Sequence, residues 1–178
     1  MKFLKIYLLI FFSTFIQAQS IKLGIKAGLN YANVTGSEIK TDAITNYHAG
    51  LVAEINLTKG LAFQPELLYS TQGATYKTAT EDFKNQLGYI TIPIMLKINL
   101  SDSLMLELGP QAGFLLSEKE KFNANKSNTF DFSANAGLGL KITENLFAQA
   151  RYGLGLIEIR SNSEIKNAVV QLSLGILF

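Results

Sequence analysis

The side chain best suited to acid–base chemistry is His48, the one histidine of the chain. Ser70, Ser133 and Asp131 are of the types that complete a hydrolytic triad with a histidine. No sequence spacing links these residues to His48, and a triad is defined by its geometry. We therefore expect no enzyme activity, and we expect His48 to be hydrogen-bonded to its neighbours.

Other common kinds of reactive site are excluded by composition. The 178 residues include no cysteine, so the chain has no thiol nucleophile, disulfide scaffold or cysteine-ligated metal. The glycine pairs at 137 and 139 and at 153 and 155 lie in apolar segments that no helix follows, unlike phosphate-binding loops. We expect neither a catalytic residue, nor a metal ion, nor a cofactor.

Charged residues recur instead at every second position of segments whose other positions are apolar. The charged members of this polar set are Lys22, Lys26, Glu54, Glu66, Lys97, Glu107, Asp131, Lys141 and Arg151. Basic and acidic members nearly balance, which suits a closed interior because a buried charge needs a partner. We expect them to form a charge network in a lumen, with Glu54, Glu66, Glu107 and Arg151 at its centre.

The elements that must position these charges are strands, because a period of two puts successive side chains on opposite faces. The alternation covers eight segments, near residues 21–31, 47–57, 61–70, 90–100, 104–114, 130–142, 146–154 and 168–178. Short turns at 58–60, 101–103 and 143–145 alternate with longer polar connections near 32–46, 73–88, 117–129 and 158–167. This layout predicts an all-β fold, an eight-stranded antiparallel up-and-down barrel.

Three features predict that the apolar face points outward into a membrane. The near-balanced charges are the first, and outward aromatic residues gathered near the long connections are the second. The third is glycine on the polar positions, which makes room for large side chains inside a narrow barrel. These glycines are Gly24, Gly28, Gly50, Gly109, Gly113, Gly137, Gly139, Gly153, Gly155 and Gly175. The alternative is a secreted, soluble, lipocalin-like barrel that binds a hydrophobic ligand.

The N-terminus has the pattern of a secretory signal peptide. Lys2 and Lys5 precede an apolar run at 6–12, and Ala18 offers a cleavage point. An N-terminal membrane anchor is the alternative, but the run is shorter than the ~20 residues of a spanning helix. We predict a signal peptide at 1–18 and a barrel domain at 19–178. Without Lys2 and Lys5 the charges balance, so we expect no nucleic-acid partner.

Several stretches resemble the outer-membrane β-barrel domain family common in Bacteroidetes, also called porin family or PorT-like. The most specific are QPELLYS at 64–70 and ITIPIMLK at 90–97, and the resemblance covers residues 20–178. It implies an eight-stranded barrel in the outer membrane and no defined activity, although one branch takes part in protein secretion. We expect a non-enzymatic, structural or interaction role through long extracellular loops, with an assembly factor for secretion as the alternative.

The last strand ends in an aromatic residue, Phe178. This ending resembles the targeting signal that the barrel-assembly machinery reads, and an unfolded barrel offers its terminal strand as an open edge. We therefore expect Phe178 to be an assembly signal. The expected partners are this machinery during biogenesis, and outer-membrane lipids and lipopolysaccharide afterwards; the sequence names no specific protein partner.

Overall fold

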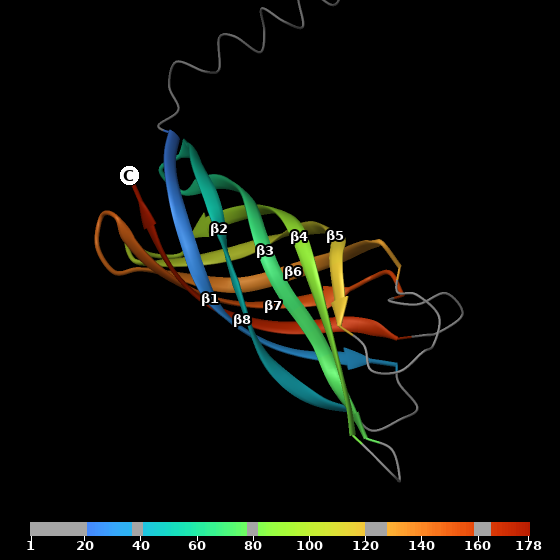
Figure 1. The fold of residues 1–178 in the computed structure, drawn as a ribbon. Coiled ribbons are helices and arrows are strands. Elements are labelled where there is room, and N and C mark those ends of the chain that lie inside the picture. The colour runs from blue at the N-terminus through green and yellow to red at the C-terminus, as the bar shows by residue number, and fades with distance from the viewer. Residues whose placement is uncertain (1–20, 37–40, 78–81, 120–127, 159–164) are drawn as a thin grey trace, which may run out of the picture.

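The computed structural model describes residues 21–36, 41–77, 82–119, 128–158 and 165–178. The predicted signal peptide at 1–18 lies outside these residues. The chain forms eight antiparallel strands joined in sequence order into a closed barrel (Figure 1). They are β1 (Ile21–Thr35), β2 (Thr41–Thr58), β3 (Leu61–Lys77), β4 (Asp82–Asn99), β5 (Leu104–Lys119), β6 (Phe130–Lys141), β7 (Leu146–Gly155) and β8 (Lys166–Leu177). The predicted fold class is confirmed.

The barrel closes between its first and last strands. β8 pairs with β1 from Gly24↔Leu177 to Thr35↔Lys166. Beyond the Gly24↔Leu177 pair, the Phe178 N–H donates to the Leu23 carbonyl at 2.7 Å. Closure removes the open edge that would otherwise leave unpaired backbone groups in lipid.

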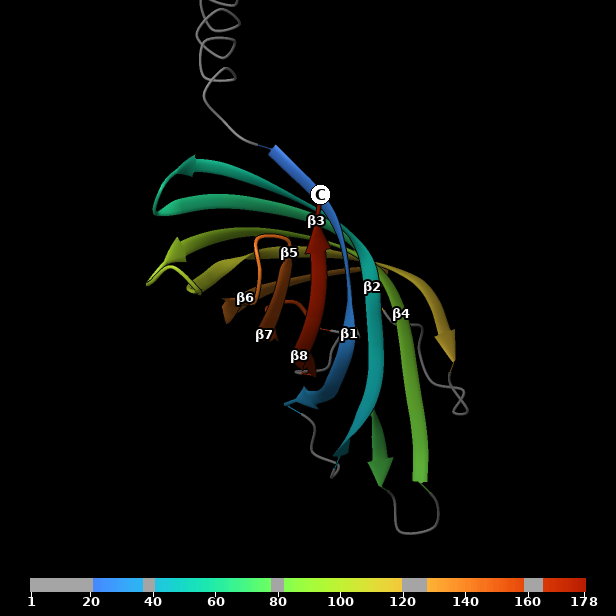
Figure 2. The same ribbon diagram turned by 90° about the vertical axis from the view of Figure 1, so that its left-hand side faces the viewer.

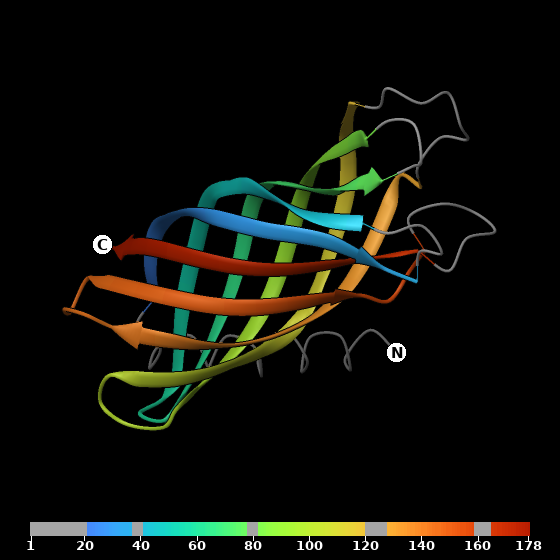
Figure 3. The same cartoon turned by 90° about the horizontal axis from the view of Figure 1, so that it is seen from below.

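The short turns and the C-terminus lie at one end of the barrel, and the strand ends that the longer connections join lie at the other (Figure 3). The short turns occur where the sequence predicts them. At the opposite end, the predicted connections at 32–46 and 73–88 are too long. In the structure β2 already begins at Thr41, β3 continues to Lys77 and β4 begins at Asp82. The β3–β4 hairpin therefore projects beyond most of the other strands (Figure 2).

The outer face of the barrel is apolar, as predicted. Leu29, Leu51 and Leu172 are 57%, 58% and 58% exposed, although they lie in the middle of their strands. The residues between them point inward and are largely polar and buried. This is the reverse of a lipocalin-like barrel, so the soluble alternative is wrong. No helix long and apolar enough to cross a membrane occurs in the part of the chain that the structure describes.

Outward aromatic side chains gather towards the end that carries the longer connections. Tyr31, Tyr47, Phe114 and Phe130 are between 42% and 59% exposed. Neighbouring rings also contact one another, with centroids 5.5 Å apart for Phe114 and Phe130. Such a belt is typical of the level at which a membrane barrel meets the lipid headgroups.

Candidate functional site: the barrel lumen

The centre of the lumen is organised around Arg151 on β7. Its Nη1 and Nη2 atoms lie 3.0 and 2.7 Å from the two carboxylate oxygens of Glu66 on β3. Its Nε atom donates to Glu107 Oε2 on β5 at 2.7 Å. The two terminal nitrogens of the guanidinium thus bind one carboxylate, and its Nε–H group binds a second. One side chain thus joins β3, β5 and β7, no two of which are neighbours in the barrel.

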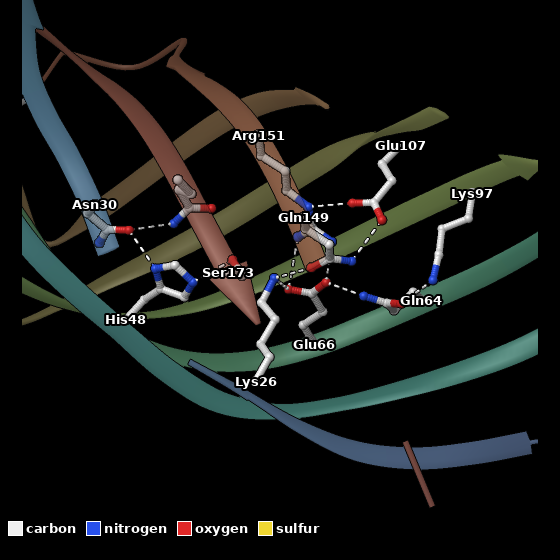
Figure 4. Close-up of polar contacts among 11 residues, drawn as sticks. Lys26, Asn30, His48, Gln64, Glu66, Lys97, Glu107, Gln149, Arg151 and Ser173 are labelled. Atoms are coloured by element: carbon white, nitrogen blue, oxygen red, sulfur yellow. Dashed lines mark hydrogen bonds and ion pairs between the residues drawn. The ribbon is translucent and has the colours of Figure 1, made fainter. Parts of the chain in front are cut away.

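Lys26 and Gln149 close these contacts into a ring. Lys26 Nζ lies 2.8 Å from Glu66 Oε2 and donates to Gln149 Oε1 at 3.1 Å. Gln149 Nε2 in turn donates to Glu107 Oε1 at 2.7 Å. We call Lys26, Glu66, Arg151, Glu107 and Gln149 the lumen ring (Figure 4). Every member is at most 4% exposed. The positive and negative charges of the ring therefore neutralise one another away from water.

A second acid–base pair joins the ring on the side of the short turns. Gln64 Nε2 donates to Glu66 Oε1 at 2.7 Å and its Oε1 accepts from Lys97 Nζ at 3.0 Å (Figure 4). Lys97 also pairs with Glu54 at 2.5 Å. The connected set therefore contains three carboxylates and three basic groups. Glu54, which the sequence analysis expected at the centre, lies instead at this margin with Lys97.

The other predicted lumen residues lie outside the connected set. Lys141 pairs with Glu144 of the adjacent turn at 3.2 Å and is partly exposed. Lys22 lines a hollow of about 150 Å³ at the short-turn end, together with Lys97 and Glu54. Asp131 is buried near the opposite end, where Asn167 Nδ2 donates to it at 3.4 Å.

His48 lies in a separate hydrogen-bonded group on the other side of the ring. Its Nδ1 is 2.7 Å from Asn30 Oδ1 and its Nε2 is 2.8 Å from Ser173 Oγ (Figure 4). Because an amide oxygen only accepts, Nδ1 carries the proton and Nε2 accepts from the Ser173 hydroxyl. The order serine–histidine–asparagine has the connectivity of a hydrolytic triad, but its members are not the Ser70, Ser133 and Asp131 considered from the sequence.

Two apolar clusters lie inside the barrel, one on each side of the lumen ring. Val34, Ala74, Leu87 and Tyr89 form one cluster inside the end that carries the longer connections. Val52, Phe147 and Leu177 form the other, between the lumen ring and the hollow at the short-turn end. The interior is thus layered as apolar, polar and apolar along the barrel axis.

Glycines make room for the ring, in agreement with the sequence analysis. A Cβ atom at Gly137 would lie 2.7 Å from Arg151 Cγ, and one at Gly139 would lie 2.6 Å from Glu107 Oε1. Sequence reasoning missed the neutral residues that hydrogen-bond in the ring and beside it, Gln64, Gln149, Asn30 and Ser173. Their inward positions in the alternation were the available signal, since a buried charge network also needs neutral donors and acceptors.

A closed eight-stranded barrel with an apolar outer face and a charged interior defines a small outer-membrane protein. Residues 17–161 match a family model described as outer membrane protein beta-barrel domain, and the chain belongs to this family. It is accordingly an outer-membrane protein. A search of curated proteins found no match.

Solved structures with the same fold include two bacterial surface proteins. Neisserial surface protein A shares 13% identity with a TM-score of 0.63, over 89% of this chain and 99% of that one. Ail, the attachment invasion locus protein of Yersinia pestis, shares 14% identity with a TM-score of 0.56, over 88% and 98%. Ail in complex with the heparin analogue sucrose octasulfate matches at 15% identity and a TM-score of 0.55, over 89% and 99%. At these identities the likeness is one of fold.

Proposed function

We propose that this barrel is a sealed, non-enzymatic protein whose role is structural or an interaction made outside the membrane. The lumen ring is the observation that supports this proposal. Five mutually bonded side chains fill the middle of an eight-stranded barrel, whose interior is only wide enough for side chains. An apolar cluster lies on each side of the lumen ring. In such a lumen the charges act as a plug.

The burial of the serine–histidine–asparagine group supports a non-enzymatic role. Ser173, His48 and Asn30 are 5%, 1% and 0% exposed. The His48 ring also packs against the backbone at Gly28, where an added Cβ would lie 2.8 Å from His48 Cε1. A lipid or peptide substrate therefore has no path to the Ser173 hydroxyl, and the group serves to tie β1, β2 and β8 together.

An interaction role rests on the end that carries the longer connections, which is extracellular in barrels of this architecture. There the β3–β4 hairpin projects beyond most of the other strands (Figure 2). Near its tip, Lys77 forms an exposed pair with Asp42 of β2. The Ail complex with sucrose octasulfate is a precedent for a ligand on a barrel of this fold. The projecting hairpin and its connections are the surface that we assign to recognition.

Further parts of the proposal concern biogenesis and relationship. We assign residues 1–18 to a cleaved signal peptide and Phe178 to recognition by the barrel-assembly machinery. Outer-membrane lipids and lipopolysaccharide surround the finished barrel. Within the family, the QPELLYS and ITIPIMLK stretches support a place in the Bacteroidetes, PorT-like group.

Planar-bilayer recording tests the sealed lumen. We expect the purified barrel to give no steady open-channel conductance, and a variant with Glu66→Ala, Glu107→Ala and Arg151→Ala to give frequent conducting events. Circular dichroism confirms that both proteins are folded barrels. Steady, large conductance of the unaltered protein contradicts the plug.

Site-specific photo-crosslinking in native outer membrane tests the interaction surface. A crosslinker in place of Lys77 on the projecting hairpin is compared with one in place of Leu57 near a short turn, both of which are exposed. We expect a discrete protein or saccharide adduct at position 77 and lipid adducts at position 57. Lipid adducts alone at both positions would leave a structural role as the conclusion.

A further inference from the structure

A small polar cavity lies in the lumen beneath the extracellular connections. Its volume is about 10 Å³, and its lining includes Gln111 on β5, Asp131, Ser133 and Asn135 on β6, and Asn167 on β8. That volume corresponds to one water-sized sphere. The cavity is separate from the lumen ring, none of whose members lines it.

Three side-chain atoms of this lining have no hydrogen-bond partner among the described residues. They are Ser133 Oγ, Asn135 Nδ2 and Asn167 Oδ1. The three residues are only 5%, 6% and 2% exposed. Buried polar atoms in native proteins are nearly always bonded, so this concentration around one cavity indicates an occupant with which they interact.

The same lining holds a carboxylate whose charge is not balanced. Asp131 is 6% exposed, and its carboxylate accepts hydrogen bonds from neutral groups, the Asn167 amide at 3.4 Å and the Phe132 backbone N–H. Glu66 and Glu107 each contact a basic group directly. Across the described residues, no lysine, arginine or histidine forms an ion pair with Asp131. A buried carboxylate is stable when a positive charge lies beside it.

Glycines on β7 keep this cavity open. A Cβ atom at Gly153 would lie 2.5 Å from Asn135 Oδ1, and one at Gly155 would lie 2.9 Å from the Asn167 backbone nitrogen. A larger residue at Gly153 would displace the Asn135 side chain, and one at Gly155 would press on the backbone of β8 at Asn167. The space is therefore set by the strands themselves.

We propose that this cavity binds one small monovalent cation, of the size of sodium, with Asp131 as its charged ligand. Ser133 Oγ and Asn167 Oδ1 supply neutral oxygens, and the Asn135 amide supplies another when it is turned by 180°. A single positive charge neutralises the single carboxylate. Calcium takes 6–8 oxygen ligands, commonly including several carboxylates, and no cluster of acidic or histidine side chains is present in the described part of the chain.

The cation would stiffen the extracellular rim. Its ligands come from β6 and β8, the strands whose ends carry the connections at 120–129 and 156–165. These strands are not neighbours, since β7 lies between them. One ion held by both would fix the spacing of the two connections above it.

Thermal unfolding of the refolded barrel in detergent tests the site, with sodium chloride compared against choline chloride at equal ionic strength. Choline is too large for a cavity of this volume. We expect a midpoint higher by about 3 °C or more in sodium, saturating with its concentration. Asp131→Asn should abolish the difference, whereas Asp42→Asn, at an exposed carboxylate, should retain it. If Asp131→Asn does not fold, Ser133→Ala serves as the second variant and should reduce the difference.

A high-resolution crystal structure determined in sodium chloride provides an independent readout, with a peak expected closer to the Asp131 carboxylate than a hydrogen-bonded water would lie. Equal midpoints in sodium and choline, or a peak at hydrogen-bonding distances from its neighbours, would mean that the cavity holds a water molecule and would overturn the proposal. Stabilisation by calcium alone would overturn the monovalent assignment.

Discussion

At the scale of single residues, the lumen depends on an arginine placed between two carboxylates. Arg151 contacts Glu66 through two nitrogens and Glu107 through a third. A lysine has one compact ammonium group and cannot reproduce this planar arrangement. Removal of Arg151 would therefore leave two carboxylates buried with only Lys26 to balance them.

Arg151→Met should lower the free energy of unfolding by about 3–5 kcal/mol, because it strands buried charge. Lys141→Met is the matched control, since Lys141 pairs with Glu144 near solvent. The control should lose about 1 kcal/mol or less. Urea unfolding of the barrel in lipid vesicles measures both. Equal losses in the two variants would mean that the lumen ring contributes nothing beyond a surface pair.

A companion variant separates charge from shape. Adding Glu107→Gln to Arg151→Met removes the one carboxylate that Lys26 does not balance, while retaining a side chain of similar volume. This double variant should recover part of the stability lost by Arg151→Met alone, as measured by the same urea titration. A further loss on adding the glutamine would contradict the electrostatic explanation.

The sequence predicted which residues face inward, but it could not predict which of them meet. Glu54 was expected with Arg151, and it pairs with Lys97 instead. The strands of a closed barrel are tilted and staggered. Residues that are equally far from the ends of their strands therefore lie at different levels of the lumen. Partner choice therefore requires the register of all eight strands.

At the scale of elements, alternation was a reliable guide only where one face meets lipid. It identified all eight strands and their short turns. It failed at the ends of β2, β3 and β4, where the sequence does not alternate strictly between apolar and polar residues. Beyond the membrane the outward face meets water, so nothing in the sequence forces the apolar–polar period there.

An arginine on the outer face should cost stability according to its depth. Leu172 lies at the middle of β8, and Leu57 lies next to a short turn; the two are 58% and 43% exposed. Leu172→Arg should lower the unfolding free energy by about 2–4 kcal/mol and Leu57→Arg by about 0–1 kcal/mol. Urea titrations in vesicles measure the difference. An equal effect at both sites would contradict a lipid-facing outer surface.

At the scale of the whole molecule, closure of the barrel depends on pairing between the first and the last strand. β1 and β8 lie at opposite ends of the sequence, yet they pair over twelve positions. Until that pairing forms, both strands present unpaired backbone groups. We propose that the chain reaches the membrane unclosed and that the last strand is the edge to which an assembly partner binds.

Deletion of Phe178 tests whether its ring is read during assembly. In the folded barrel the ring is 72% exposed, and its backbone N–H adds one bond to β1. The truncated chain should therefore refold into detergent with nearly normal yield, while in cells it should accumulate or be degraded in the periplasm. Membrane fractionation measures the second outcome, and Phe178→Leu separates loss of the ring from loss of the backbone bond. Normal outer-membrane levels of the truncated chain would contradict the signal, and failure in both settings would instead assign Phe178 to barrel stability.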